Sequence, residues 1–385
     1  MTEIYEVIII GAGPIGSYLA HRLAVSGRHV LVLDKNNNPG DKVCCTGIIS
    51  KGCFDKLELD ETIKYSAYNT AKLIGPLQQS LDFKRHNTVA YIVDRPALNI
   101  LLSARARAAG VRVTYSSDVI DLQTYKDKIS VKTRTGDEIK YFDGQMLVIA
   151  TGFSPRSRLS PCSAQIPRFT IGMQSSVEVL NCSEPQIYLD YDIAPGGFAW
   201  LMPTWDNKGL AGVLCGIKPK QHLTYFLEKL KREGKISDNT GKAECGLIPL
   251  RRLKTTYGER LIVLGEAAGQ VKPTTGGGIY YGLLCAEIAA EVIEKGFRNS
   301  DFSTGQFKEY QKQWHKLLQT ELTAGYLIQS VWRRLQNKQL NYMFNLLRKY
   351  DFAGEIEKSD VFPFDWHSKV LLHQATRFIM SMNKK

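Results

Sequence analysis

Two adjacent thiols, Cys44 and Cys45, open the run CCTGIIS, and Gly47 follows two positions after the second thiol. A thiol tolerates apolar surroundings and is acidic enough to exchange protons, so it can act as a general acid beside a hydrophobic substrate. Three roles are open for Cys45: it assists catalysis, it packs against a cofactor, or it forms a redox-active pair with Cys44. Because Gly47 lets the backbone pass close to a ring system, the spacing favours the first role and favours Cys45 over Cys44.

Three glycines, Gly11, Gly13 and Gly16, follow a short apolar run, and Asp34 follows a second apolar run further along. The first glycine permits a tight turn, the second lets a pyrophosphate approach the backbone, and the third lets a helix close on the strand. The carboxylate of Asp34 can accept a hydrogen bond from a ribose hydroxyl. This combination predicts dinucleotide binding.

A second glycine-rich region, GEAAGQVKPTTGGGI, runs from Gly265 to Ile279 and leads into a helical pattern. It supplies further positions for close backbone approach and a helix N-terminus, whose dipole favours an anionic or electron-rich partner. Together with Arg95 in a DRxxL segment, these residues indicate a flavin-binding clamp.

Phe198, Trp200 and Met202 alternate along the run FAWLMP, which ends at Pro203. On a strand, residues two apart share one face. These side chains therefore either fill a core or form a flat apolar wall along which a long hydrocarbon chain could lie, with Pro203 at its end. Such a wall binds through buried apolar area, at about 25 cal/mol per Å², without polar recognition.

The elements that must position these residues begin with a strand–helix–strand unit at 5–10, 17–25 and 29–33. A helix follows the DRxxL segment, and strands are expected at 117–123, 128–134, 138–142 and 146–150. Alternating polarity predicts strands at 169–179, 186–191, 197–202 and 210–217, a helix at 222–232 and a short strand at 260–264. From about residue 300 the pattern is helical.

We therefore expect a mixed α/β fold with a Rossmann-like FAD-binding domain, an inserted β-sheet substrate domain and a helical C-terminal region. The FAD-binding domain is predicted to be discontinuous, with residues 1–60, 90–160 and 255–300. The substrate-binding sheet domain is predicted at 61–89 and 161–254, and the helical region at 301–385.

The bulk composition is that of a globular protein, with 44% hydrophobic and 23% charged residues over a length of 385. The first residues lack the features of a signal peptide, and no stretch approaches the ~20 apolar residues that a membrane span requires. The eight cysteines are irregularly spaced, which fits reduced thiols in a cytoplasmic protein and offers no iron–sulfur ligand set. No metal site is predicted.

The formal net charge of +12 is unevenly distributed, because no acidic residue occurs from Leu322 to Tyr350. Basic residues in this stretch alternate with apolar ones, including Trp332, at helical spacing. The pattern fits either a pair of core-packing helices or a peripheral contact with a membrane surface. Nucleic acid is not expected as a partner, since no recognised binding motif accompanies the charge.

Six motifs, GAGPIG, KVCCTGIIS, YIVDRPAL, ATGFSPRSR, GGFAWLMP and GEAAGQVKPTTGGGI, occur in that order over roughly residues 5–295. In this order they resemble the geranylgeranyl reductase family of FAD-dependent oxidoreductases, within the wider aromatic hydroxylase class of flavoproteins. The resemblance implies saturation of isoprenoid double bonds, with Cys45 beside the flavin ring. The cofactor-binding positions that it implies are Gly11, Ala12, Gly13, Gly16, Asp34, Lys35, Cys44, Cys45, Thr46, Gly47, Arg95, Val119, Gly265, Glu266, Gly277, Gly278 and Ile279.

Three positions depart from the family pattern. Glu266 stands where the family usually has aspartate, Phe198 stands where a tyrosine is usual, and a later Gly-x-Gly is reduced to Gly212 alone. An FAD-dependent monooxygenase or halogenase acting on an apolar or aromatic substrate is an alternative interpretation, because such enzymes share the fold and the aromatic-x-Trp-x-apolar-Pro string also resembles one found in halogenases. Electrons would come from NAD(P)H or from a ferredoxin-like carrier, since no second dinucleotide domain is visible.

Overall fold

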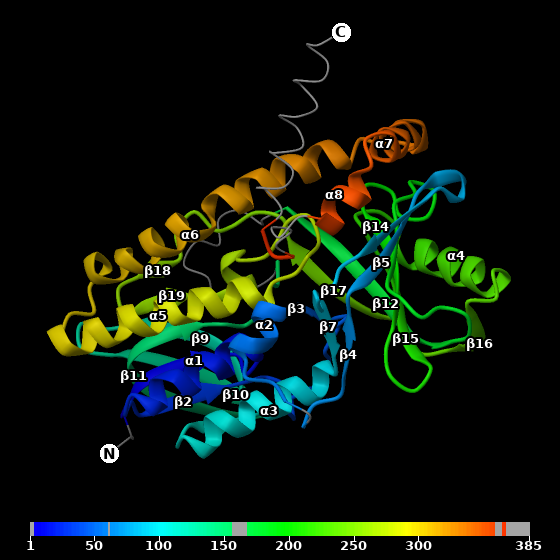
Figure 1. The fold of residues 1–385 in the computed structure, drawn as a ribbon. Helices are drawn as coiled ribbons and strands as arrows, with labels where there is room; N and C mark the ends of the chain where they lie inside the picture. The colour runs from blue at the N-terminus through cyan, green and yellow to red at the C-terminus, as the bar shows by residue number, and fades with distance from the viewer. Residues whose placement is uncertain (1–3, 61, 156–167, 359–363, 367–385) are drawn as a thin grey trace, which may run out of the picture. The chain divides into compact units, whose positions relative to one another are not determined.

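The computed structural model describes residues 4–60, 62–155, 168–358 and 364–366, which fold into two compact units (Figure 1). Unit 1 comprises Met1–Val43, Asp94–Arg168 and Ile248–Leu322. Unit 2 comprises Cys44–Val93, Phe169–Leu247 and Thr323–Lys385. Each unit is thus assembled from three separate stretches of chain.

Unit 1 contains a sheet whose central strands are parallel and run in the order β19, β11, β1, β2, β8. Its strands read as nearly continuous apolar runs because both faces of the sheet are covered, and Ile8 and Ile9 are fully buried. The antiparallel strands β18, β9 and β10 complete the sheet. The strand bounds are β1 Ile4–Ile10, β2 Val30–Leu33, β8 Arg112–Thr114, β9 Asp118–Thr124, β10 Ile129–Thr135, β11 Glu138–Ile149, β18 Tyr257–Gly258 and β19 Leu261–Val263.

The strand β11 differs from the sequence expectation, which placed two strands at 138–142 and 146–150. The chain stays extended through Asp143 and Gly144, so the two form one strand. The first part pairs antiparallel with β10 and the second part pairs parallel with β1. The polar run Asp143-Gly144-Gln145 is typical of a turn, but pairing with β10 and β1 keeps it extended.

The helices of unit 1 pack around the start of α1. The helix α1 (Pro14–Val25) packs against both α3 (Arg95–Ala108) and α5 (Ile279–Asn299). The hydroxyl of Tyr18 donates to a carboxylate oxygen of Glu287 at 3.1 Å, which ties α1 to α5. The short helix η2 (Gly265–Ala268) follows β19, and the long helix α6 (Thr304–Trp332) follows α5.

Unit 2 is built on a larger, mostly antiparallel sheet in the order β16, β12, β15, β14, β13, β5, β6, with β17 paired to β12. A smaller sheet has the order β3, β7, β4. The strand bounds are β3 Ile48–Ser50, β4 Tyr65–Tyr68, β5 Thr70–Ile74, β6 Ser80–Lys84, β7 Ala90–Val93, β12 Phe169–Val179, β13 Gln186–Tyr188, β14 Phe198–Pro203, β15 Lys208–Cys215, β16 Ile236–Thr240 and β17 Glu244–Pro249. The helices are α2 Lys51–Lys56, η1 Pro76–Gln78, α4 Pro219–Arg232, α7 Asn337–Lys349 and α8 Phe352–Lys358.

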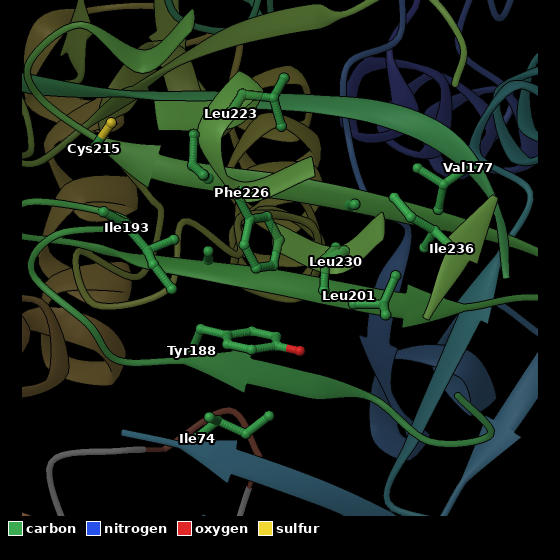
Figure 2. Packing of buried hydrophobic residues seen from close by; sticks show 14 of the residues in the cluster. Ile74, Val177, Tyr188, Ile193, Leu201, Cys215, Leu223, Phe226, Leu230 and Ile236 are labelled. Atoms are coloured by element: carbon green, nitrogen blue, oxygen red, sulfur yellow. The ribbon is translucent and has the colours of Figure 1, made fainter. Parts of the chain in front are cut away.

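The helix α4 covers one face of the larger sheet. Figure 2 shows Leu223, Phe226 and Leu230 of α4 packed among side chains of the sheet. The rings of Phe226 and Tyr188 meet edge to face, with centroids 4.9 Å apart. Ala199 and Leu201 of β14 belong to this core, so their alternating neighbours in the strand face the other side of the sheet.

The burial of Phe226 predicts a large loss of stability on truncation. For Phe226→Ala we expect the free energy of unfolding to fall by about 3–5 kcal/mol, because the ring is fully buried. The measurement is urea denaturation followed by circular dichroism. Tyr225→Ala is the matched control, since this neighbouring ring is 47% exposed and its loss should change stability by no more than about 0.5 kcal/mol. Equal losses for the two variants would contradict the packing of α4 on the sheet.

Candidate functional site

The turn between β1 and α1 is formed by glycines that have no room for a side chain. Gly11 has a φ of +108°, and a Cβ built on it would lie 2.4 Å from the carbonyl oxygen of Ala150. A Cβ on Gly16 would lie 1.9 Å from the carbonyl oxygen of Gly11. Strand β1, strand β11 and helix α1 can therefore meet only if these two residues are glycine.

Gly13 differs from its neighbours because the space beside it is open. No heavy atom of the described chain lies within 4 Å of a Cβ built on Gly13. Gly13 is also the N-cap of α1 and provides no side-chain cap, with Pro14 as the first helical residue. An open approach to uncapped N–H groups at a helix N-terminus fits a phosphate group.

Asp34 lies at the end of β2 and secures the same turn. One of its carboxylate oxygens accepts from the N–H of Ala12 at 2.6 Å, and the other accepts from the N–H of Asn36 at 2.8 Å. Each oxygen keeps a second lone pair, so a ribose hydroxyl could still donate to Asp34. The neighbouring Lys35 is exposed. Sequence reasoning gave Asp34 only the ligand contact, whereas its backbone contacts also fix the glycine turn.

Glu266, in the turn after β19, stands between two of the other loops. Its carboxylate oxygens lie 4.0 Å from the Cβ position of Gly152 and 3.3 Å from that of Gly278. Burial raises the pKa of the Glu266 carboxyl, and the positive charge of Arg95 acts in the opposite direction. Gly265 before it has a φ of +70°. The end of β11, the turn after β19 and the start of α5 thus come together around one carboxyl group.

Arg95 carries an unsatisfied donor in the same region. The side chain is buried, and its Nη1 donates to Oδ1 of Asn99 at 3.1 Å. Its Nε has no hydrogen-bond partner among the residues that the structure describes. A buried N–H without a partner is costly, so this atom is suited to an oxygen-rich ligand. The open space at Gly13, the uncapped start of α1 and this donor together fit a dinucleotide.

The remaining predicted positions of unit 1 are Val119, in the core, and three residues at the start of α5. The side chain of Val119, on β9, is buried in the hydrophobic core of unit 1, so its backbone is the part that a ligand could contact. Gly278 is the N-cap of α5 without a side-chain cap, and Ile279 is the first residue of that helix. Gly277 lies against Lys272, whose Nζ is 3.6 Å from the Cβ position.

Lys272 is a residue that sequence reasoning did not single out. Its side chain is only 6% exposed, although a lysine in a glycine-rich loop is usually solvated. Its ammonium group lies 5.7 Å from the centre of the Tyr281 ring. The apolar neighbour Val271 and the following Pro273 were the only local signals of this burial.

The thiol segment belongs to unit 2, and the structure gives its two cysteines different surroundings. Sγ of Cys45 accepts from the N–H of Gly47 at 3.4 Å. Gly47 has a φ of +78°, and its carbonyl accepts from the N–H of Val93 at 3.0 Å. Cys44 instead faces β17, with its Sγ 3.7 Å from the Cβ position of Gly246. Both thiols are half-buried, and neither forms a disulfide.

Thr46 connects this segment to the larger sheet of unit 2. Its hydroxyl donates to Oε1 of Gln174 at 3.0 Å. Gln174 on β12 pairs with Gly212 on β15, which pairs with Trp200 on β14. Residues paired across strands share a face, so the thiol segment lies over the face that carries Trp200. Gln174 was not foreseen as a site residue.

The apolar wall predicted on β14 is one face of that strand. A Cβ on Gly212 would lie 2.2 Å from the indole of Trp200, so the indole covers Gly212. The rings of Phe198 and Trp200 have centroids 5.8 Å apart. Trp200 and Met202 are buried and Phe198 is half-buried, and Pro203 is the last residue of the strand. Gly212, the one glycine kept from the family's Gly-x-Gly, leaves the space in which the indole packs.

Comparison with known proteins gives relatives along nearly the whole chain. A family model described as pyridine nucleotide-disulphide oxidoreductase matches residues 5–161. A digeranylgeranylglycerophospholipid reductase of Methanocaldococcus jannaschii is 25% identical, over 90% of this chain and 91% of the relative. A reductase of the same name from Methanothermobacter thermautotrophicus is 27% identical, over 91% of this chain and 93% of the relative.

Solved structures share the fold. A geranylgeranyl bacteriochlorophyll reductase-like protein of Thermoplasma acidophilum superposes with a TM-score of 0.83 and 21% identity, covering 94% of both chains. A flavin-dependent brominase gives a TM-score of 0.73 with 16% identity, covering 99% of this chain and 100% of the other. The predicted mixed α/β fold class, with its Rossmann-like and β-sheet parts and its C-terminal helices, is confirmed. The comparisons also confirm the resemblance to the geranylgeranyl reductase family, and they identify this chain as an FAD-dependent oxidoreductase.

Proposed function

We propose that this protein reduces carbon–carbon double bonds of an isoprenoid, such as a geranylgeranyl-type lipid, a quinone tail or a prenyl diphosphate. Relatives that match nine tenths of the chain are named as reductases of a digeranylgeranyl lipid. The observation that carries the proposal is the 3.0 Å bond from Thr46 to Gln174, which brings a thiol segment to the face with the apolar wall. A proton donor over an apolar surface suits the reduction of a hydrocarbon chain.

FAD is the proposed resident cofactor, and when bound it supplies the hydride. We assign its pyrophosphate to the open space at Gly13 and a ribose hydroxyl to Asp34. We assign the remaining parts of FAD to Arg95, to Glu266 and to the start of α5 at Gly278. The remaining cofactor positions named from the resemblance stay predictions.

The substrate is assigned to the wall formed by Phe198, Trp200 and Met202. Ala199 and Leu201 anchor the same strand in the core beneath α4, so the wall is held rigidly. Each prenyl unit that leaves water for such a surface contributes about 25 cal/mol per Å² of buried apolar area. Affinity should therefore rise with chain length.

We assign Cys45 the role of proton donor. Addition of a hydride to one carbon of a double bond must be matched by addition of a proton to the other, and the thiol gives up its proton as that bond forms. The resulting thiolate accepts the N–H of Gly47, which stabilises the negative charge until solvent returns a proton. Cys44 faces β17 and has no part in this step.

The electron donor is proposed to be NAD(P)H or a ferredoxin-like carrier in the cytoplasm, and the substrate is proposed to come from a membrane surface. Anaerobic bleaching of the flavin absorbance with each donor distinguishes the two. The alternative of a monooxygenase or halogenase shares the fold with the brominase. Mass spectrometry of products from a panel of prenyl substrates decides between them: added hydrogen supports the reductase, whereas added oxygen or halogen overturns it.

The open space at Gly13 predicts a variant that folds but binds FAD more weakly. We expect Gly13→Val to lower FAD affinity ~5- to 150-fold, since overpacking costs about 1–3 kcal/mol and each 1.4 kcal/mol is tenfold. Flavin fluorescence titration of the apoprotein measures the affinity. Gly216→Val is the control, because its Cβ position is also open and Gly216 is none of the residues proposed to bind the cofactor. Unchanged affinity in Gly13→Val would place the pyrophosphate elsewhere.

The different surroundings of the two thiols predict different kinetic effects. Cys45→Ser keeps the size of the side chain but replaces the thiol with a much weaker acid, so turnover should fall ~100- to 10,000-fold while FAD content is unchanged. Cys44→Ser should retain turnover near that of the native protein. Steady-state assays with saturating prenyl substrate and equal flavin content measure both. Full activity of Cys45→Ser would show that the proton comes from water or another group.

A further inference from the structure

The helix α7 has a clear inner face and a clear outer face. Leu340 and Phe344 are buried, and the ring of Phe344 lies 2.6 Å from the Cβ position of Gly75 in the turn that leads into η1. On the opposite side, exposed residues follow at helical spacing. This outer row consists of Lys338, Tyr342, Asn345 and Lys349, and Tyr342 is 64% exposed.

The last turns of α6 repeat this arrangement. The indole N–H of Trp332 donates to the carbonyl of Gly197 at 2.9 Å, which fixes the inner face of the helix on unit 2. Leu327 and Val331 lie one turn apart on the outer side, and each is 60% exposed. Arg334 follows them on the same row and is exposed.

The tip of the β5–β6 hairpin adds a further exposed apolar side chain beside α7. Leu77, in η1, is 80% exposed and has a φ of 58°, a conformation that a leucine rarely adopts. Gly75, two residues earlier, contacts Phe344 of α7. The turn therefore presents Leu77 to solvent next to a helix whose outer row is basic.

The charged residues from the last turns of α6 through α7 all have one sign. The stretch from Leu322 to Tyr350 has no acidic residue. Its exposed cations are Arg333, Arg334, Lys338, Arg348 and Lys349. We call this set, with the apolar residues Leu77, Leu327, Val331 and Tyr342, the basic–apolar surface.

We propose that the basic–apolar surface docks this protein on an anionic lipid bilayer, an inference that rests on the proposed lipid substrate. Exposed apolar side chains flanked by lysine and arginine on amphipathic helices suit the boundary between head groups and acyl chains. Each cation near an anionic membrane strengthens binding roughly fivefold. No helix among the described residues is long and apolar enough to cross a membrane, so this contact would be peripheral.

Helix α4 and the residues just before it offer a matched comparison within unit 2. Ile217 and Tyr225 are 65% and 47% exposed, and Lys218 and Lys220 stand close to them in the sequence. On α4, however, Glu228 interrupts the positive charge and pairs with Lys231 at 3.0 Å. This α4 side has similar exposed apolar groups without uniform charge, and the inference predicts that it does not dock.

The test is co-sedimentation of the flavin-loaded full chain with vesicles of phosphatidylserine and phosphatidylcholine. Leu327→Ser/Val331→Ser removes apolar contacts, and Lys338→Glu/Lys349→Glu reverses two charges. We expect each double variant to bind at least ~20-fold more weakly, and binding of the native chain to fall with rising salt and in vesicles without phosphatidylserine. The control variants Ile217→Ser/Tyr225→Ser and Lys218→Glu/Lys220→Glu should bind like the native chain.

Two further measurements make the result decisive. Flavin content and melting temperature show that every variant is folded, and turnover of a detergent-solubilised prenyl substrate should be unchanged in the surface variants. Vesicle binding that ignores lipid charge and salt, or surface variants that bind normally, would overturn the inference. A second outcome would also overturn it: the native chain is a dimer by light scattering, Leu327→Ser/Val331→Ser is a monomer, and neither binds vesicles. Vesicle binding without turnover of any prenyl substrate would instead overturn the proposed function and leave the docking surface standing.

Discussion

The carbonyl oxygen of Ala150 occupies the space where Gly11 would carry a side chain, and the carbonyl oxygen of Gly11 does the same for Gly16. This contact joins the ends of β1 and β11 to the first turn of α1, and the other elements of the unit 1 site depend on it. Asp34 can bond the N–H of Ala12 only while the turn keeps this shape. The carboxyl ends of β1 and β2 therefore carry, in one region, the open space at Gly13 and the carboxylate of Asp34.

Unit 2 uses a missing side chain for a different purpose. At Gly212 the absent Cβ makes room for the flat indole of Trp200 rather than for a backbone turn. Gln174, on the strand next to Gly212, then has an oxygen available for the Thr46 hydroxyl. One small residue thus lets an apolar wall and a thiol segment share a sheet face, and the chemistry proposed for Cys45 depends on that sharing.

Local patterns in the sequence were sufficient for most of the fold. The apolar runs of β1 and β2 and the alternation of β12 were recognisable because each is decided by burial of one segment. The strand β11 was missed as a single element, since its polar centre is held extended by partners on both sides. The glycine spacing likewise predicted the β1–α1 turn, because that motif is contained in a few consecutive residues.

The parts of the site that sequence did not reveal are contacts between distant residues. Thr46 and Gln174 are 128 positions apart, and no periodic pattern links them. The burial of Lys272 depends on how a loop closes over it, and glycines and prolines around a lysine are equally common in solvated loops. The spacing to Gly47 singled out Cys45 in the sequence, but only the fold shows that Gly47 donates to Cys45 and that Cys44 faces β17.

Because each unit is assembled from three stretches of chain, neither is complete early in synthesis. The sheet of unit 1 needs β19, and its helical layer needs α5, so synthesis must proceed through Asn299 before that unit can close. Most multidomain proteins can fold an N-terminal domain while the rest is still being made. Here the apolar strands β1 and β2 are made long before β19 and α5, so partly synthesised chains expose apolar surface that the finished unit buries.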